Sequence, residues 1–177
     1  MPEVSVIIPV YNNERFVEKC IRSVMEQTFR DLEILVVNDG STDRSGEILE
    51  RLAAGDSRIV YISQENRGVA AARNRAFDIA SGKYLTFVDG DDYIGRDYIS
   101  QLYAAAEQKS TEMLICGLTC VDAEGKILSQ IVPGEYQRFE KEEWTFRISA
   151  VWCHFYRRSL WERYHIRFRS GERGEDM

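Results

Sequence analysis

Three carboxylates fall within four residues at Asp89-Gly90-Asp91-Asp92, directly after a short apolar run from Tyr84 to Val88. Such a run is typical of a buried strand, and like charges packed this closely repel one another. A divalent cation would relieve the repulsion, because carboxylate oxygens suit Mg²⁺ or Mn²⁺, and magnesium usually takes one or two carboxylates together with substrate phosphates. The stretch therefore predicts a metal–diphosphate site at a strand end, with a solvated acidic turn as the alternative, since turns also favour Asp and Gly.

This run is the fourth strand in a regular alternation of expected strands and helices. The expected strands span 4–10, 32–37, 59–62 and 84–88, and helices are expected over 14–27, around 48–52 and over 69–80. The order βαβαβαβ predicts a Rossmann-like α/β fold, with a mostly parallel sheet, helices on both faces and right-handed crossovers. Pro9 is expected to close the first strand, because proline cannot donate to a central ladder. Gly82 is expected as the C′ residue of the third helix.

Polar residues at the ends of these four strands should share one cleft, because ligands bind an open α/β sheet beyond its carboxyl ends. The candidates are Tyr11, Asn12, Glu14, Asp39, Asn66, Arg67, Arg73, Asp89, Asp91 and Asp92. Asp39 could accept a hydrogen bond from a base or ribose, or serve only as a turn and helix-cap residue. Arg73 could pair with a diphosphate, whose geometry its guanidinium matches, or form an ordinary surface salt bridge.

The chain after residue 92 predicts a smaller, partly antiparallel portion. The expected elements are a helix over 98–109, strands over 113–120 and 126–132 joined by a hairpin at 122–125, a short helix at 144–148, a strand over 151–156 and a helix over 160–164 capped by Ser159. Neither a dinucleotide-binding fingerprint nor a P-loop is present in the sequence.

The composition is that of an ordinary globular domain, with 177 residues, 44% apolar and 29% charged. The net charge of −6 argues against a nucleic-acid partner. Four cysteines without a C-x-x-C pair, and only two histidines, disfavour a structural zinc site and indicate reduced thiols in a cytoplasmic protein. No signal peptide or membrane-length apolar run is expected. The basic C-terminal third predicts a solvated face, with peripheral contact to the inner face of the plasma membrane as the alternative.

Several motifs, met in order along nearly the whole chain, resemble the family 2 glycosyltransferases. They are VIIPVYN at 6–12, VNDGSTD at 37–43, NRG at 66–68, ARN at 72–74, FVDGDD at 87–92, HFYRR at 154–158 and GED at 174–176. The resemblance implies a glycosyltransferase-A fold in a single domain, 1–177, with a nucleotide-binding half over 1–92 and a donor and acceptor half over 93–177. It also implies an inverting enzyme, dependent on Mn²⁺ or Mg²⁺, that moves a sugar from a UDP-sugar to a glycan or lipid-linked acceptor in cell-surface polysaccharide synthesis.

The resemblance also implies a role for each matching position. Those that would lie at the nucleotide or its diphosphate are Pro9, Tyr11, Asn12, Glu14, Asn66, Arg67 and Arg73. Asp39 would hydrogen-bond the uracil edge. Asp89 would contact the ribose or the metal shell, Asp91 would bind the metal directly, and Asp92 would orient the donor sugar. Asp176 would be the general base that takes the proton of the acceptor hydroxyl.

The sequence departs from the family pattern at its end. It stops one residue after Asp176, whereas family members continue with a helix and often a further metal ligand, commonly a histidine. His154 lies too early to be that ligand and is expected to be a hydrogen-bonded strand residue. We therefore expect a C-terminally truncated chain that binds donor but transfers poorly. Two alternatives remain, a nucleotide-sugar-binding fragment without turnover and a sugar nucleotidyltransferase, although the latter's glycine-rich, lysine-bearing loop is missing.

Overall fold

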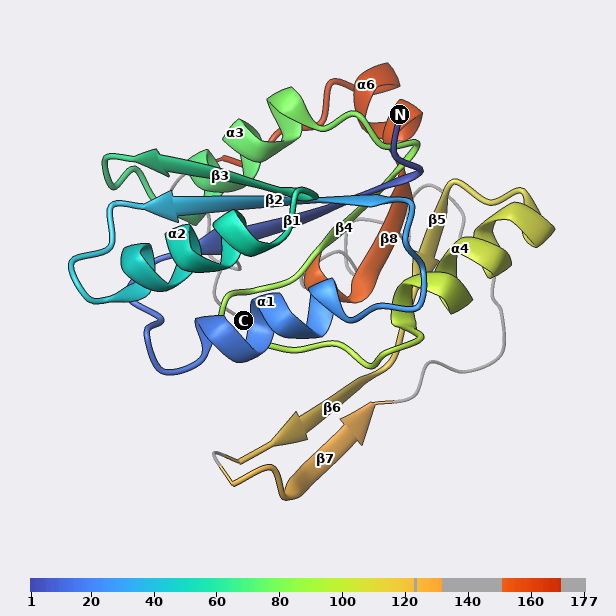
Figure 1. The fold of residues 1–177 in the computed structure, drawn as a ribbon. Helices are drawn as coiled ribbons and strands as arrows, with labels where there is room; N and C mark the ends of the chain where they lie inside the picture. Colours follow the sequence, from blue (N-terminus) through green and yellow to red (C-terminus); the bar gives the residue numbers. More distant parts are fainter. Residues whose placement is uncertain (123, 132–150, 170–177) are drawn as a thin grey trace.

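The computed structural model describes residues 1–122, 124–131 and 151–169. It contains a central six-stranded sheet between two layers of helices, and a hairpin that projects away from the sheet (Figure 1). The strands of the sheet are β1 Val4–Val10, β2 Leu32–Asp39, β3 Ile59–Gln64, β4 Tyr84–Phe87, β5 Met113–Ile115 and β8 His154–Arg157. Their spatial order is β3-β2-β1-β4-β8-β5.

The first four strands are parallel, as the alternating pattern predicts. β1 pairs with β2 on one side and with β4 on the other, and β3 pairs with the far side of β2. The helices are α1 Val17–Met25, α2 Ser45–Gly55, α3 Val69–Ile79, α4 Tyr98–Lys109 and α6 Arg158–Arg163. Helices α1, α2 and α4 cover one face around Val6 and Ile34, whereas α3 and α6 cover the other face around Ile7 and Phe87 (Figure 1). Both faces of the inner strands are therefore buried, which explains their continuous apolar runs.

Pro9 does not close β1, which continues to Val10 and pairs with β2 throughout. In a parallel strand, alternate residues direct their backbone polar groups to the same neighbour, and the Ile7 carbonyl accepts from the Val88 N–H at 3.0 Å. Pro9 therefore faces the β4 side, where the paired register has already ended at Phe87. The missing N–H is tolerated because no strand of the sheet needs it at that point.

The expected strand over 113–120 is wrong as a single element. Its first part, β5, joins the central sheet antiparallel to β8, and its last part, β6 Leu118–Val121, pairs with β7 Ile127–Ile131 in a separate hairpin. The pairing with the sheet ends where the Cys116 N–H donates to the Cys153 carbonyl at 2.8 Å. A 3₁₀ turn at Val151–Cys153 precedes β8, so among residues 1–122, 124–131 and 151–169 no strand of the central sheet lies beside the chain after Cys116.

Helix boundaries also differ from the expectations. Helix α1 begins at Val17 rather than residue 14, because Asn13–Phe16 form a turn in which the Asn13 carbonyl accepts from the Phe16 and Val17 N–H groups. Ser159 does not cap α6 but lies inside it, and the N-cap residue of this helix is Arg157. The expected helix at 144–148 lies outside the described residues.

His154 is a fully buried strand residue, as expected. Its ring stacks on Tyr156 with centroids 5.5 Å apart, and its Nδ1 lies 3.5 Å from the Cys153 Sγ. Packing within the sheet therefore accounts for this histidine.

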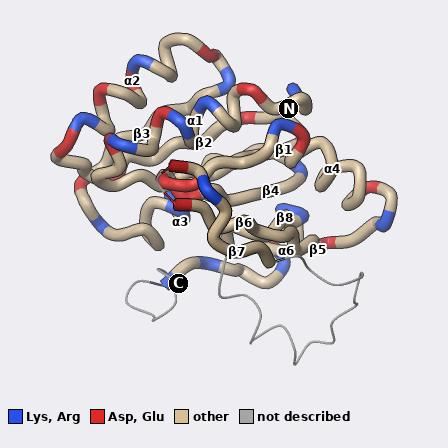
Figure 2. Tube along the Cα trace, turned by 90° about the horizontal axis from the view of Figure 1, so that it is seen from below, with Lys and Arg blue, Asp and Glu red and all other residues tan. Residues whose placement is uncertain are grey.

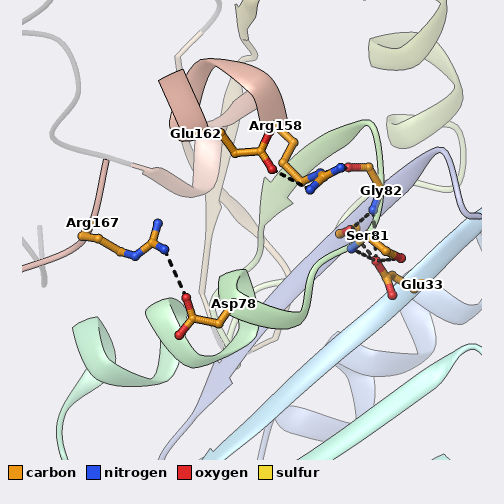
Figure 3. Close-up of polar contacts among 8 residues, drawn as sticks. Glu33, Asp78, Ser81, Gly82, Arg158, Glu162 and Arg167 are labelled. Atoms are coloured by element: carbon orange, nitrogen blue, oxygen red, sulfur yellow. Dashed lines mark hydrogen bonds and ion pairs between the residues drawn. The ribbon is translucent and has the colours of Figure 1, made fainter. Parts of the chain in front are cut away.

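Gly82 is required by close packing rather than by a helix C-cap. It has no positive φ, but a Cβ at this position would lie 2.5 Å from the Ser5 backbone nitrogen. The Gly82 N–H donates to the Ser5 Oγ at 2.9 Å, and the Ser5 hydroxyl donates to Glu33. Glu33 also accepts from the N–H groups of Ser81 and Gly82 (Figure 3). This network fixes the entry into β4, the strand that ends in the acidic tip.

Acidic and basic positions are interspersed over much of the chain trace (Figure 2), in keeping with the modest net charge of −6. Among the described residues, none of the helices has both the length and the apolar character needed to span a bilayer.

Candidate functional site

The loop after β1 is held against the loop after β2. Asn12 has a left-handed backbone conformation, with φ of 52°, a region that asparagine tolerates better than most residues. Its N–H donates to the Ser41 Oγ at 3.1 Å, and its Oδ1 accepts from the Thr42 N–H at 2.8 Å. Glu14 accepts from the Arg44 N–H at 3.0 Å. Two of the predicted nucleotide-pocket residues thus organise these loops.

Asp39 fastens the loop after β3. Only 3% of this residue is exposed, and its carboxylate accepts from the Gln64 Nε2 at 2.7 Å, the Arg67 N–H at 2.9 Å and the Gly68 N–H at 2.8 Å. Gly68 is the N-cap residue of α3. The helix-cap role considered for Asp39 is not present, because neither α2 nor α3 has a side-chain hydrogen bond at its N-cap; Asp39 instead fixes the loop between β3 and α3.

Arg73 forms a buried ion pair with the acidic tip. Its side chain is 3% exposed, and its Nη2 lies 2.8 Å from an Asp89 carboxylate oxygen whose side chain is 26% exposed. Because the guanidinium is buried, this pair is not the exposed salt bridge that the alternative interpretation expects. Exposed pairs contribute little to stability. It joins the first half of α3 to the end of β4.

Asp91 and Asp92 are exposed. The Asp92 N–H donates to the Asp89 carbonyl at 2.9 Å in a tight turn. Partial desolvation, and then the charges of Asp91 and Asp89, raise the pKa of the Asp92 carboxyl to about 6. A bound cation would offset this repulsion.

Cys20, on α1, supports the same turn from behind. Its thiol lies 3.4 Å from the Asp89 carbonyl oxygen and can donate to it. Burial is the main cause that raises the pKa of the Cys20 thiol, and the charges of Asp92, Asp89 and Asp91 add to it. The thiol therefore stays protonated, so it acts as a weak donor and not as a nucleophile.

The oxygen atoms of Asp89, Asp91 and Asp92 are the type of ligand that a divalent cation prefers. Among residues 1–122, 124–131 and 151–169, no group of three or more His, Cys, Asp or Glu side chains is arranged to hold a metal ion. A magnesium-type site does not require such a cage, because one or two carboxylates and substrate phosphates complete it. Asp91 and Asp92 present those oxygens to solvent, and Arg73 holds Asp89 beside them.

The loops after the four parallel strands are linked along one edge of the sheet, and the single cleft expected for their polar residues stays a prediction. Asn12 bonds the β2 loop, Asp39 bonds the β3 loop, and Arg73 bonds the β4 end. The chain after β4 also lies against the end of β1, since a Cβ added at Gly90 would be 3.2 Å from the Pro9 carbonyl oxygen. The remaining candidates lie on the same loops, with Tyr11 at 48% exposure and Asn66 and Arg67 also exposed.

A cavity of about 330 Å³ lies beside this edge of the sheet, lined by Ile62, Ser63, Gln64, Glu65, Arg67 and Arg75. Two lining residues, Gln64 and Arg67, hold Asp39. The cavity is thus on the β3 side of that edge and away from the acidic tip. Gln64 was absent from the sequence-based candidates, although its place at the end of the third strand could have indicated it.

Asp176 lies outside the described residues. The segment that leads toward it is described as far as Arg169, and it packs on α3 through Asn74, whose amide bonds the backbone of Phe168. The sequence motif at 72–74 includes Asn74 but does not indicate this contact.

The comparison with family models decides the classification. Residues 5–164 match the model described as glycosyl transferase family 2. The chain belongs to this family. EpsJ of Bacillus subtilis, described as an uncharacterized glycosyltransferase, is 40% identical over 179 residues, which cover 95% of this chain and 52% of EpsJ.

Solved structures agree with the fold. A crystal structure of S. aureus TarS in complex with UDP superposes with a TM-score of 0.76 and 26% identity, covering 96% of this chain and 50% of that one. The mannosyltransferase PcManGT from Pyrobaculum calidifontis, in complex with GDP-Man and Mn²⁺, has a TM-score of 0.72 at 20% identity, covering 99% of this chain and 50% of that one. The chain therefore has the glycosyltransferase-A type of α/β fold and spans about half the length of these relatives.

Proposed function

We propose that this chain is the donor-binding domain of an inverting, metal-dependent glycosyltransferase. It would move a sugar from a UDP-sugar to a hydroxyl of a glycan or lipid-linked acceptor in bacterial surface polysaccharide synthesis. The observation that carries the proposal is the acidic tip at this edge of the sheet, where Asp91 and Asp92 are exposed and Arg73 holds Asp89. TarS binds UDP and PcManGT binds GDP-Man with Mn²⁺, which supports a nucleotide-sugar donor.

The uracil would bind beside Asp39. A carboxylate has about four acceptor positions, and the described contacts use two on Oδ1 and one on Oδ2. One position on Oδ2 is left for the imide N–H of the base. The same carboxylate would therefore hold the β3 loop and select the base, which makes the site preorganised.

The diphosphate would lie over the acidic tip. A cation bound by Asp91, with Asp89 near it, would neutralise the charge that develops on the leaving diphosphate. Arg73 keeps Asp89 in place from below, and Asp92 would orient the donor sugar. We assign the nucleotide half to 1–92 on this basis, and the donor and acceptor half to 93–177.

The transfer itself is a single displacement. The acceptor hydroxyl attacks the anomeric carbon on the side opposite the diphosphate, the bond to the diphosphate breaks, and the configuration inverts. Asp176 would take the hydroxyl proton as general base. We place the reaction at the cytoplasmic side, where contact with the membrane would bring a lipid-linked acceptor to the site.

Titration of the chain with UDP, with and without Mn²⁺, tests donor binding. Release of UDP from a panel of UDP-sugars then separates an enzyme from a binding fragment. We expect Mn²⁺-dependent binding of UDP, and the absence of binding under both conditions would contradict the proposal.

A further inference from the structure

Two consecutive residues of α3 contact one segment near the end of the described chain. The Arg73 guanidinium lies 5.3 Å from the centroid of the Phe168 ring while it pairs with Asp89. The Asn74 amide bonds the Phe168 backbone in both directions, since its Nδ2 donates to the Phe168 carbonyl at 2.9 Å and its Oδ1 accepts from the Phe168 N–H at 3.0 Å. One side chain thus satisfies both backbone polar groups of Phe168.

The Phe168 ring is wedged between α3 and the end of β4. Its centroid lies 5.4 Å from the centroid of the Phe87 ring, in an edge-to-face arrangement, and 5.3 Å from that of the Trp161 ring. Phe87 is the last residue of β4 and lies two positions before Asp89. The ring therefore contacts the strand that carries the acidic tip as well as the arginine that holds it.

Residues 166–169 belong to neither a helix nor a strand. A second link to α3 is the ion pair of Arg167 with Asp78, at 3.2 Å (Figure 3). That pair is about half exposed on both sides, so it should contribute little. The Asn74 contact is half-buried. Its two hydrogen bonds satisfy the Phe168 N–H and carbonyl, which belong to neither a helix nor a strand, and buried backbone groups need such partners.

We propose that Asn74 is a positioning residue that clamps the 166–169 segment to α3, and that Arg73 and Asn74 together couple the donor site to this segment. The inference rests on the proposed function for its ligand, but the clamp itself does not. Occupation of the acidic tip would be transmitted through Asp89 and Arg73 to the Phe168 ring. The segment immediately before residues 170–177 would then be held most firmly when the donor is bound.

Amide hydrogen exchange on the whole chain tests the clamp. In Asn74→Ala, exchange at Phe168 should accelerate at least about tenfold, because two hydrogen bonds of ordinary strength are lost. Asn74→Asp keeps the acceptor for the Phe168 N–H and should accelerate it less. Asp78→Asn is the matched control on the same helix and segment, and should change it less than about twofold. Equal exchange in Asn74→Ala and wild type, with both folded by circular dichroism, would overturn the clamp.

The coupling is tested with UDP and Mn²⁺ as the probe. Saturation should slow exchange at Phe168 in the wild type and in Asp78→Asn, and not in Asn74→Ala. Because coupling is reciprocal, Asn74→Ala should also bind UDP more weakly than the wild type, by the factor to which UDP slows exchange at Phe168 in the wild type. A purely structural role for Asn74 would not produce this difference. If UDP binds but leaves Phe168 unchanged in the wild type, the coupling is refuted. If UDP does not bind the wild type, the proposed function fails, while the exchange experiment without ligand still decides the clamp.

Discussion

The buried pair of Arg73 and Asp89 makes a quantitative prediction about stability. Substitution Arg73→Met keeps most of the side-chain stem but removes the charge that faces Asp89. Breaking a buried ion pair by removing one partner typically costs about 3–5 kcal/mol, because a charge is left without its counterion in a desolvated place. Asp89 is 26% exposed, so water will solvate it in part, and we expect about 3 kcal/mol.

For a chain of this length, each kcal/mol lowers the melting temperature by about 2–4 °C. Arg73→Met should therefore melt about 6–12 °C below the wild type at neutral pH. Urea unfolding followed by circular dichroism should give the free-energy loss directly, from a lower midpoint at an unchanged m-value.

Arg75→Met is the matched control, because Arg75 lies on the same helix but is exposed. It should change stability by less than about 0.5 kcal/mol. The double variant Arg73→Met/Asp89→Asn should be more stable than the sum of the single losses implies, with a coupling of about 1–3 kcal/mol. If Arg73→Met costs less than about 1 kcal/mol and matches Arg75→Met, the pair does not hold the acidic tip and the reasoning is wrong.

Four further substitutions test the site and its support. Asp91→Ala should abolish the Mn²⁺ dependence of UDP binding measured by calorimetry, and unchanged dependence would remove its role as ligand. Gly82→Ala should cost about 1–3 kcal/mol in urea unfolding, because its Cβ would lie 2.5 Å from the Ser5 nitrogen; a smaller cost would mean that the backbone relaxes easily. Asp39→Asn should weaken UDP binding at least about tenfold, because an amide turns part of the acceptor set into donors; equal affinity would place the base elsewhere. Asp176→Asn should abolish sugar transfer and spare UDP binding, and retained turnover would mean that another residue is the general base.

The parallel half of the fold could be predicted from the sequence because its signals are local. Continuous apolar runs such as 32–37 mark strands buried on both faces, and helical spacing between them marks the crossovers. The order βαβαβαβ then leaves few topologies, so the common edge of the strand ends follows. The family was also predictable, because its motifs follow a fixed order along the chain, and those at 6–12, 37–43 and 87–92 span the ends of β1, β2 and β4.

The antiparallel half was predicted less well, because partner choice there is not a local property. The run 113–120 has a strand-like composition throughout, yet it divides between the sheet and a hairpin opposite His154, the residue at which β8 begins. Gly82 was expected as the C′ residue of α3, but the C-cap of that helix is Ala80, and the approach of Ser5 from another strand is what requires a glycine. Such constraints arise from residues far away in the chain, and no window of sequence contains them.

The amino-acid sequence by itself determined the class of fold, the edge of the sheet at which polar residues gather, and the cluster of carboxylates at 89–92. Only the tertiary structure decided which groups those residues contact: Asp39 binds the start of α3, Arg73 is buried against Asp89, and Asn74 holds the Phe168 backbone. The physical reason is range. Hydrophobic periodicity is written within single elements, whereas hydrogen bonds and ion pairs depend on distances of about 3 Å between side chains that only the packed sheet and helices bring together.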